Sequence, residues 1–70
     1  MLSNIEAERV RNQITKKELA EELGIDVRTY YNWINENADI PSKKLKQLAE
    51  KFQVSMEYLI KDSASGKTKN

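Results

Sequence analysis

The chain has 70 residues, a net charge of +1 and 33% charged side chains, which suits one small domain with little core to spare. It has no cysteine and no histidine, so disulfides, thiolate metal sites and imidazole acid–base chemistry are excluded. No apolar run could span a membrane and no signal-peptide pattern is present, so we expect a cytoplasmic protein without membrane, metal or cofactor.

Helix-start signals recur along the chain and predict an all-α fold. Ser3 with Glu6, and Thr15 with Glu18, have the spacing of capping boxes, and Asp26 can cap the helix that follows it. We predict helices over residues 4–12, 16–23, 27–34, 43–52 and 56–61. No alternating β-branched segment of useful length competes with this prediction.

Residues 16–34 have the pattern of two short helices joined by a tight turn. Leu19 and Leu23 share one face of the first helix, and Ala20 leaves room beside them for a crossing helix. Gly24 follows where the turn needs a positive φ, which glycine adopts at little cost. This spacing predicts a helix-turn-helix.

The second helix of this pair is predicted to have a buried face and an exposed face. Tyr30 and Trp33 lie about one turn apart and are expected in the core. The opposite face carries the side chains that a DNA-binding module would present to the major groove, namely Val27, Arg28, Tyr31 and Asn32.

The last predicted helix, which Ser55 can cap, packs apolar side chains into a very short segment. These side chains are Met56, Tyr58, Leu59 and Ile60. We expect that so short a helix cannot bury all of them against its own domain, so they are candidates for a dimer interface. Completion of the monomer's own core is the open alternative. We predict a domain over residues 1–61 and a disordered polar tail over residues 62–70.

The run from residue 5 to residue 60 resembles the phage Cro/repressor-type helix-turn-helix family, also called the XRE-type family. The residues that carry the resemblance are Thr15, Leu19, Ala20, Leu23, Gly24, Ile25, Tyr30, Trp33, Pro41, Ser42, Leu48, Ala49, Val54, Ser55, Tyr58 and Leu59. The resemblance implies a five-helix bundle of the lambda-repressor-like type, with the helix-turn-helix in the second and third helices. It also implies a transcriptional regulator, a repressor of the phage or mobile-element kind, on a palindromic double-stranded DNA operator.

Carried over position by position, the resemblance divides the expected DNA contacts into two groups. Val27, Arg28 and Asn32 fall where side chains reach base edges, and they suit a thymine methyl, guanine and adenine respectively. The positions expected to contact the backbone, or backbone and bases together, are Thr15, Lys16, Tyr31, Asn35, Lys43 and Lys44. A palindromic operator and so small a footprint favour a homodimer on DNA.

Two positions depart from the family pattern. The family commonly pairs an arginine in its first helix with a glutamate directly after the tryptophan position. Here Arg9 is present but Ile34 occupies the glutamate place, so Arg9 must find Glu6, Glu8 or another acid. Tyr30 replaces the usual isoleucine or valine, so its hydroxyl needs a partner inside the domain.

The main alternative is a protein-interaction module on the same fold, such as an antitoxin-like or antagonist partner of another regulator. The near-neutral charge and the apolar Val27 and Ile34 favour this alternative. An enzyme is not expected, because the sequence offers no nucleophile–base set, phosphate loop or metal constellation, and no small-molecule ligand is evident.

Overall fold

The computed structural model describes residues 1–61, and its elements within that range are all helices. They are α1 (Ser3–Arg11), α2 (Lys16–Leu23), α3 (Val27–Ile34), α4 (Ser42–Phe52) and α5 (Met56–Ile60). Each helix begins and ends within one residue of its predicted bounds, so the all-α prediction is confirmed. The predicted disordered tail, residues 62–70, lies outside the described residues.

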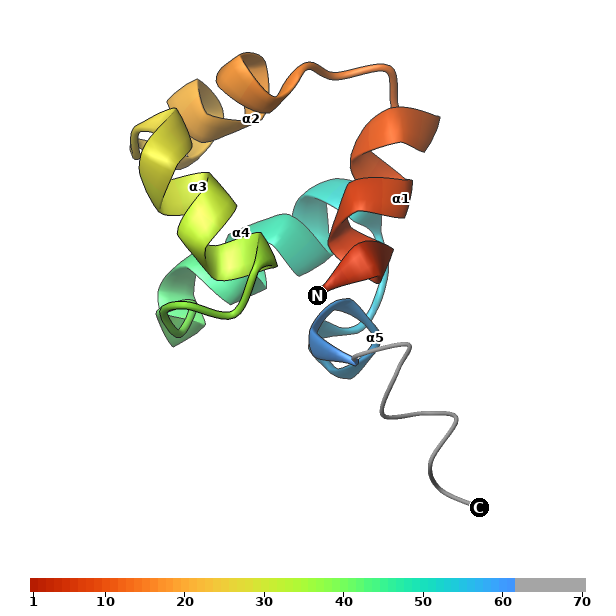
Figure 1. The fold of residues 1–70 in the computed structure, drawn as a ribbon. Coiled ribbons are helices and arrows are strands. Elements are labelled where there is room, and N and C mark those ends of the chain that lie inside the picture. Colours follow the sequence, from red (N-terminus) through yellow and green to blue (C-terminus); the bar gives the residue numbers. More distant parts are fainter. Residues whose placement is uncertain (62–70) are drawn as a thin grey trace.

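The five helices enclose one hydrophobic core (Figure 1). α2 packs against α3, while α1 packs against both α3 and α5, and α4 packs against α5. Every helix contributes a fully buried side chain to the core: Ile5, Leu19, Tyr30, Leu48 and Leu59. Burial of each of the four aliphatic side chains in this set stabilises the fold by about 1.5–3 kcal/mol, and the Tyr30 ring adds further apolar burial.

Side-chain caps fix where α2, α3 and α5 begin. In the predicted capping box, Thr15 Oγ1 accepts from the Glu18 N–H at 3.0 Å, and Glu18 Oε1 accepts from the Thr15 N–H at 2.9 Å. Asp26 caps α3 by accepting from the Thr29 N–H at 2.9 Å, and Ser55 caps α5 by accepting from the Tyr58 N–H at 3.0 Å. Each cap satisfies a backbone donor that lacks a partner within the helix, which is worth about 0.5–2 kcal/mol.

The capping box predicted for Ser3 and Glu6 is wrong. α1 begins at Ser3 itself, and Leu2, at the N-cap position, supplies no side-chain cap. Leu2 is buried, and its backbone N–H donates to the carbonyl of Ile34 at the end of α3, at 2.8 Å. Glu6 is therefore not needed at the helix start, and its carboxylate accepts hydrogen bonds from other side chains.

The turn between α2 and α3 has the predicted geometry. Gly24 has a φ of +72°, and the N–H of Ile25 donates to the carbonyl of Ala20 at 3.0 Å. Lys44 of α4 adds a contact that the sequence did not predict, because its Nζ donates to the carbonyl of Leu23 at 2.6 Å. A cation at the C-terminus of α2 satisfies a carbonyl without an intrahelical partner and complements the helix dipole.

Candidate nucleic-acid interface

The outer face of α3 is exposed, and its inner face is in the core, as predicted. Tyr30, Trp33 and Ile34 are at most 4% exposed. On the opposite side, Val27 and Tyr31 are 38% and 44% exposed. Arg28 is also exposed, while Asn32 is half-buried. A helix that is anchored on one side and open on the other can enter a groove without losing its core contacts.

The start of α2 lies beside this outer face. The Nζ of Lys16 stands 5.0 Å from the ring centroid of Tyr31, in a cation–π contact. The Tyr31 ring also meets the Tyr30 ring edge-on, with centroids 6.5 Å apart and planes at 65°. Tyr31 therefore has packing partners on two sides although nearly half of it is exposed, which fixes its direction before any ligand arrives.

Several of the residues predicted to contact the DNA backbone come together at this edge. Lys16, Tyr31 and Asn35 line one small cavity of about 130 Å³. Thr15, which directly precedes α2, is exposed, and its hydroxyl oxygen serves the capping box. The Glu6 carboxylate lines the same cavity and offsets part of the Lys16 charge there. The ammonium of Lys16 and the N-terminus of α2 therefore favour an anion at the exposed edge outside the cavity.

The two predicted lysine contacts on α4 differ in the structure. Lys43 is exposed at the start of the helix, where its ammonium can reach a ligand. Lys44 is half-buried, and its ammonium is bound to the Leu23 carbonyl. A phosphate contact by Lys44 would require this hydrogen bond to break, so the structure favours Lys43 over Lys44 as a backbone contact.

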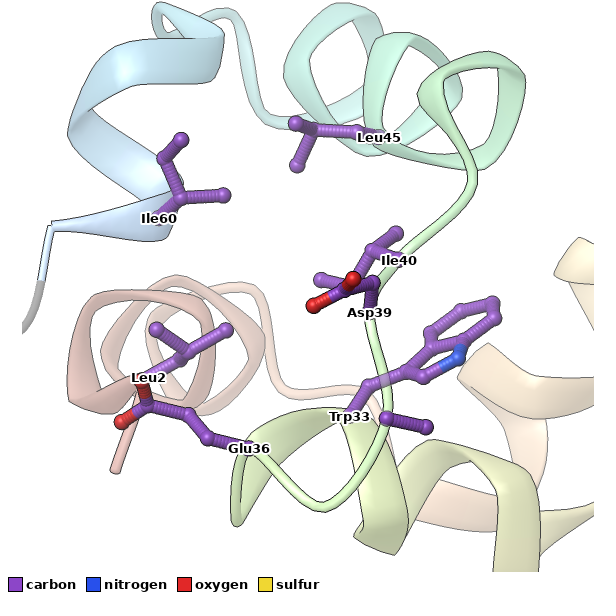
Figure 2. A pocket seen from close by; sticks show the side chains of 8 residues that line it. Leu2, Trp33, Glu36, Asp39, Ile40, Leu45 and Ile60 are labelled. Atoms are coloured by element: carbon purple, nitrogen blue, oxygen red, sulfur yellow. The ribbon is translucent and has the colours of Figure 1, made fainter.

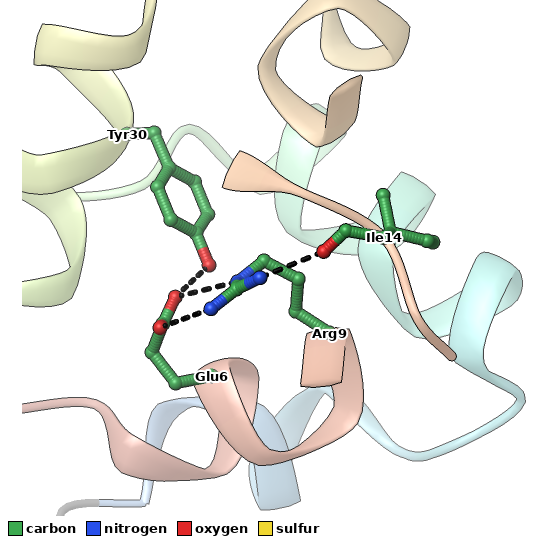
Figure 3. Close-up of polar contacts among 4 residues, drawn as sticks. All are labelled: Glu6, Arg9, Ile14 and Tyr30. Atoms are coloured by element: carbon green, nitrogen blue, oxygen red, sulfur yellow. Dashed lines mark hydrogen bonds and ion pairs between the residues drawn. The ribbon is translucent and has the colours of Figure 1, made fainter. Parts of the chain in front are cut away.

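Behind α3 lies a polar network that joins three segments (Figure 3). The Tyr30 hydroxyl donates to Glu6 Oε2. Arg9 donates to the same carboxylate through Nη2 at 2.9 Å and Nε at 3.2 Å. The remaining Arg9 nitrogen, Nη1, donates to the carbonyl of Ile14 at 2.7 Å. Both departures from the family pattern are thereby resolved: Arg9 pairs with Glu6, and the same carboxylate accepts the tyrosine hydroxyl.

The network keeps its protons in a defined arrangement. Burial alone would raise the pKa of Glu6, but hydrogen bonds from Arg9 and Tyr30 and the nearby positive charges outweigh it, so the net pKa is lowered. Burial and the carboxylate of Glu6 raise the pKa of Tyr30 well above its ordinary value. At neutral pH, Glu6 is therefore an acceptor with a full negative charge, and Tyr30 is a proton donor to it.

Sequence reasoning predicted the members of this network only in part. It named Glu6 as one of several possible partners for Arg9 and stated that the Tyr30 hydroxyl needs a partner, but it did not join the two. One signal in the sequence could have linked Glu6 to Tyr30. The arginine lacks its usual acid and the tyrosine needs a partner, so one carboxylate could serve both.

The described residues show no second kind of site. Within residues 1–61, no group of three or more aspartate or glutamate side chains could hold a metal ion. In the same range, none of the helices has the length and apolar character needed to cross a membrane.

Comparison with known families agrees with this geometry. Residues 5–59 match the model of a helix-turn-helix family, the Cro/C1 or XRE type with a lambda-repressor-like fold. The chain belongs to this family of DNA-binding transcriptional regulators, which has no catalytic activity. No curated protein and no solved structure matches the chain.

Proposed function

We propose that this protein is a sequence-specific transcriptional repressor that reads the major groove of its operator with α3. One observation carries the proposal: α3 is locked into the core along one face, and its other face is exposed beside the cationic start of α2. The family resemblance supports the repressor role and an origin in a phage or mobile element. We also propose a cytoplasmic location, where such an operator would lie.

Base recognition is assigned to three side chains of α3. Arg28 is exposed, and its guanidinium can donate two parallel hydrogen bonds to guanine O6 and N7. Val27, at the first position of the helix, can pack on a thymine methyl. Asn32 is half-buried and lies near the C-terminal end of α3, which should enter the groove less deeply than the N-terminal end. We therefore expect its contact with adenine to be the weakest of the three.

Backbone binding is assigned to residues around the start of α2 and the ends of α3 and α4. Lys16 and Tyr31 form the centre of this group, since their mutual contact orients both toward the same edge. Thr15, Asn35 and Lys43 are exposed and complete the proposed phosphate contacts. Lys44 is the weakest member of the group, because its ammonium already binds Leu23.

We further propose that two copies bind half-sites about 34 Å apart, one turn of DNA. The dimer surface that we propose leaves out Leu59, which is fully buried and belongs to the monomer's core, the alternative that the sequence left open. Met56 and Tyr58 are half-buried against the same core, and the Tyr58 hydroxyl donates to Glu8 Oε2 at 3.1 Å. α5 is short enough to fit beside α1 and α4, so it buries more of its apolar surface than we expected.

Ile60 is the part of α5 that supports the dimer proposal. It is 49% exposed and lies at the rim of a hollow of about 360 Å³ (Figure 2). Apolar side chains from five segments line the hollow, and Glu36 and Asp39 line it as well. An apolar side chain of a second copy could enter this hollow. Sedimentation that shows only a monomer on a palindromic duplex would contradict the dimer.

The function is tested by selecting duplexes from a randomised library and measuring affinity by fluorescence anisotropy across a salt series. We expect a two-fold-related motif and an affinity that falls steeply with salt. Arg28→Ala should lose about 1–3 kcal/mol of preference at one base pair. Arg11→Ala is the matched control, because Arg11 is an exposed arginine of α1 that is not among the proposed DNA contacts.

The protein-interaction module predicts a different result, with no retention of DNA even at low salt. Part of its support is removed by the structure, because Ile34 is 4% exposed and lies in the core. Val27 is then the one apolar side chain of α3 left to favour it. Salt-sensitive retention without a motif would instead show phosphate binding alone, and sequence-specific readout would be wrong.

A further inference from the structure

Glu6 is the point where the two DNA-facing helices are tied to α1. Through Oε2 it accepts the hydroxyl of Tyr30, which projects from the inner face of α3. Through both oxygens it holds Arg9, and Arg9 in turn holds the carbonyl of Ile14. Ile14 directly precedes Thr15, the N-cap of α2. One carboxylate thus reaches α3 directly and the start of α2 through a single side chain.

The hydrogen bonds of Glu6 and Arg9 act at the start of α2 and the middle of α3, which lie away from the turn at Gly24. Gly24 joins the C-terminus of α2 to the start of α3, so the chain itself sets their spacing there. The start of α2 and the middle of α3 have no such covalent constraint. Their direct contact is the Lys16 ammonium over the Tyr31 ring, between two side chains that are both partly open to solvent. The Glu6 network lies behind that contact, with Glu6 and Arg9 side chains 18% and 14% exposed.

We propose that Glu6 is a positioning residue for DNA readout, which holds α3 and the start of α2 in the relative position that base recognition requires. This inference rests on the proposed function, since it concerns how the same interface discriminates between sequences. Glu6 itself touches no DNA in this scheme. It acts through Tyr30 on α3 and through Arg9 on the segment before α2.

The preference for the operator over other sequences should depend strongly on this network, whereas phosphate binding should depend on it only weakly. A bidentate contact between Arg28 and guanine requires donor and acceptor atoms to be aligned, and hydrogen bonds weaken steeply with misalignment. Attraction between lysines and phosphates is long-ranged and has no such angular demand. A small shift of α3 against α2 should therefore lower the preference for the operator while leaving non-specific binding and its salt dependence unchanged.

The chain offers a matched control on the same helix. Glu8, also on α1, accepts the hydroxyl of Tyr58 at 3.1 Å and so ties α1 to α5. Tyr58→Phe and Tyr30→Phe each delete one phenol hydroxyl that donates to a carboxylate of α1. Only the second deletion affects a helix of the helix-turn-helix, so a general loss of stability and a loss of positioning can be told apart.

The experiment compares wild type, Tyr30→Phe and Tyr58→Phe on two duplexes: the one that wild type enriches from a randomised library, and a scramble of the same composition. The readout is the ratio of the two affinities, with thermal melting of each variant recorded in parallel. We expect Tyr30→Phe to lower the ratio about ten-fold, roughly the discrimination of one base contact, by weakening binding to the enriched duplex alone. Tyr58→Phe should keep the wild-type ratio, and its melting temperature shows how much stability the chain can lose without a change in that ratio.

Glu6→Gln, with Glu8→Gln as its control, provides a second pair should Tyr30→Phe fold too weakly to assay. A glutamine keeps an acceptor for Tyr30 but removes the charge that holds Arg9, so we expect a reduced ratio here too, with unchanged affinity for the scramble. If wild type discriminates between the duplexes and Tyr30→Phe or Glu6→Gln discriminates equally well, the positioning role alone is overturned. A wild type without preference would overturn the proposed function, and the positioning role with it.

Discussion

The two sides of α1 make the same kind of bond and serve different parts of the molecule. Glu6 accepts a tyrosine hydroxyl from α3, and Glu8 accepts one from α5. Residues two apart on a helix point in different directions, so a single helix can hold both partners. The Glu6 carboxylate also binds Arg9, which is mostly buried, whereas Arg11 stands 3.8 Å from Glu8 with its side chain 69% exposed. The larger network is the one that joins α1 to α3 and to the segment before α2.

Both helices combine apolar packing with hydrogen bonds to α1, since Asn4 and Glu8 each bond to Tyr58 of α5. The bonds on the α3 side form the larger network, which also includes Arg9 and the Ile14 carbonyl. Leu59 is fully buried in α5, and Met56 and Tyr58 pack against the same core. α3 buries Tyr30, Trp33 and Ile34 while its other face stays open, and the polar network adds directional bonds to this packing. Variants on the α3 side of α1 should therefore affect stability and DNA discrimination, whereas variants on the α5 side should affect stability alone.

The largest expected difference is in truncation of the two tyrosines. Tyr30→Ala removes a ring that is 1% exposed and should lower the free energy of unfolding by about 3–5 kcal/mol, as for other buried aromatic truncations. Tyr58 is half-buried, so Tyr58→Ala should cost about 1–2 kcal/mol. Urea denaturation followed by circular dichroism measures both. Equal losses would contradict the description of α3 as the more tightly anchored helix.

The next effect separates Lys44 from Lys43. Lys44→Met should lower the free energy of unfolding by about 1–2 kcal/mol, because the Leu23 carbonyl loses a charged donor. The same variant should leave the salt dependence of DNA binding unchanged. Lys43→Met should do the reverse, with little effect on stability and a salt slope reduced by about one. If Lys44→Met also reduced the salt slope, Lys44 would leave Leu23 to bind phosphate in the complex.

A smaller effect concerns pH, and its sign follows from the direction of each shift. Because the folded pKa of Glu6 is lowered, its stabilising contribution is present above the unfolded value of 4.5 and is lost as the pH falls through the folded pKa. Because the pKa of Tyr30 is raised, its contribution is present below 10.0 and is lost as the pH rises above that value.

Thermal melting across pH tests this expectation. Tyr30→Phe should flatten the loss of stability above pH 10.0, since it removes the titrating hydroxyl. Glu6→Gln should flatten part of the loss below pH 4.5. Asp26, whose pKa is lowered by its hydrogen bond to the Thr29 N–H, should account for another part of the acid limb. A Glu6→Gln variant with the wild-type acid limb would contradict the charged state assigned to Glu6.

The smallest effect is a stabilisation on the α5 side. Gln53 ends α4 with a φ of +58°, a left-handed conformation that strains a residue with a side chain. Gln53→Gly should relieve this strain and raise the free energy of unfolding by about 0.5 kcal/mol after the greater entropy of the unfolded glycine is subtracted. The ratio of affinities for the two duplexes should not change. A changed ratio would contradict the statement that the α5 side of α1 does not affect DNA discrimination.

Local features of the fold were predictable because their causes lie within a few residues. The capping box of Thr15 and Glu18, the positive φ of Gly24 and the cap at Asp26 all follow from short spacings. The division of α3 into two faces follows from helical periodicity, which Tyr30 and Trp33 display clearly. The capping box at Ser3 failed because Leu2 is drawn into the core, a tertiary effect that the local pattern does not contain.

Contacts between distant segments could not be predicted in the same way. Tyr30 and Glu6 are 24 residues apart, and Lys44 and Leu23 are 21 apart, so no periodicity joins them. For Leu59 the sequence left two alternatives open, a dimer surface and the monomer's own core, because a short helix has little room to bury side chains in isolation. Its burial depends on the corner that α1 and α4 form around it, which only the assembled fold provides.

The most direct test of the central claim is an NMR titration of labelled protein with the duplex that it enriches from a library. We predict that the largest shifts of backbone amide signals fall on residues 15–17 and 27–32, with smaller ones at Asn35 and Lys43. The amides of Val10 and Arg11, on the outer side of α1, should keep their positions. Shifts concentrated on α1 or α5, with residues 27–32 unchanged, would contradict the assignment of α3 as the helix that reads DNA.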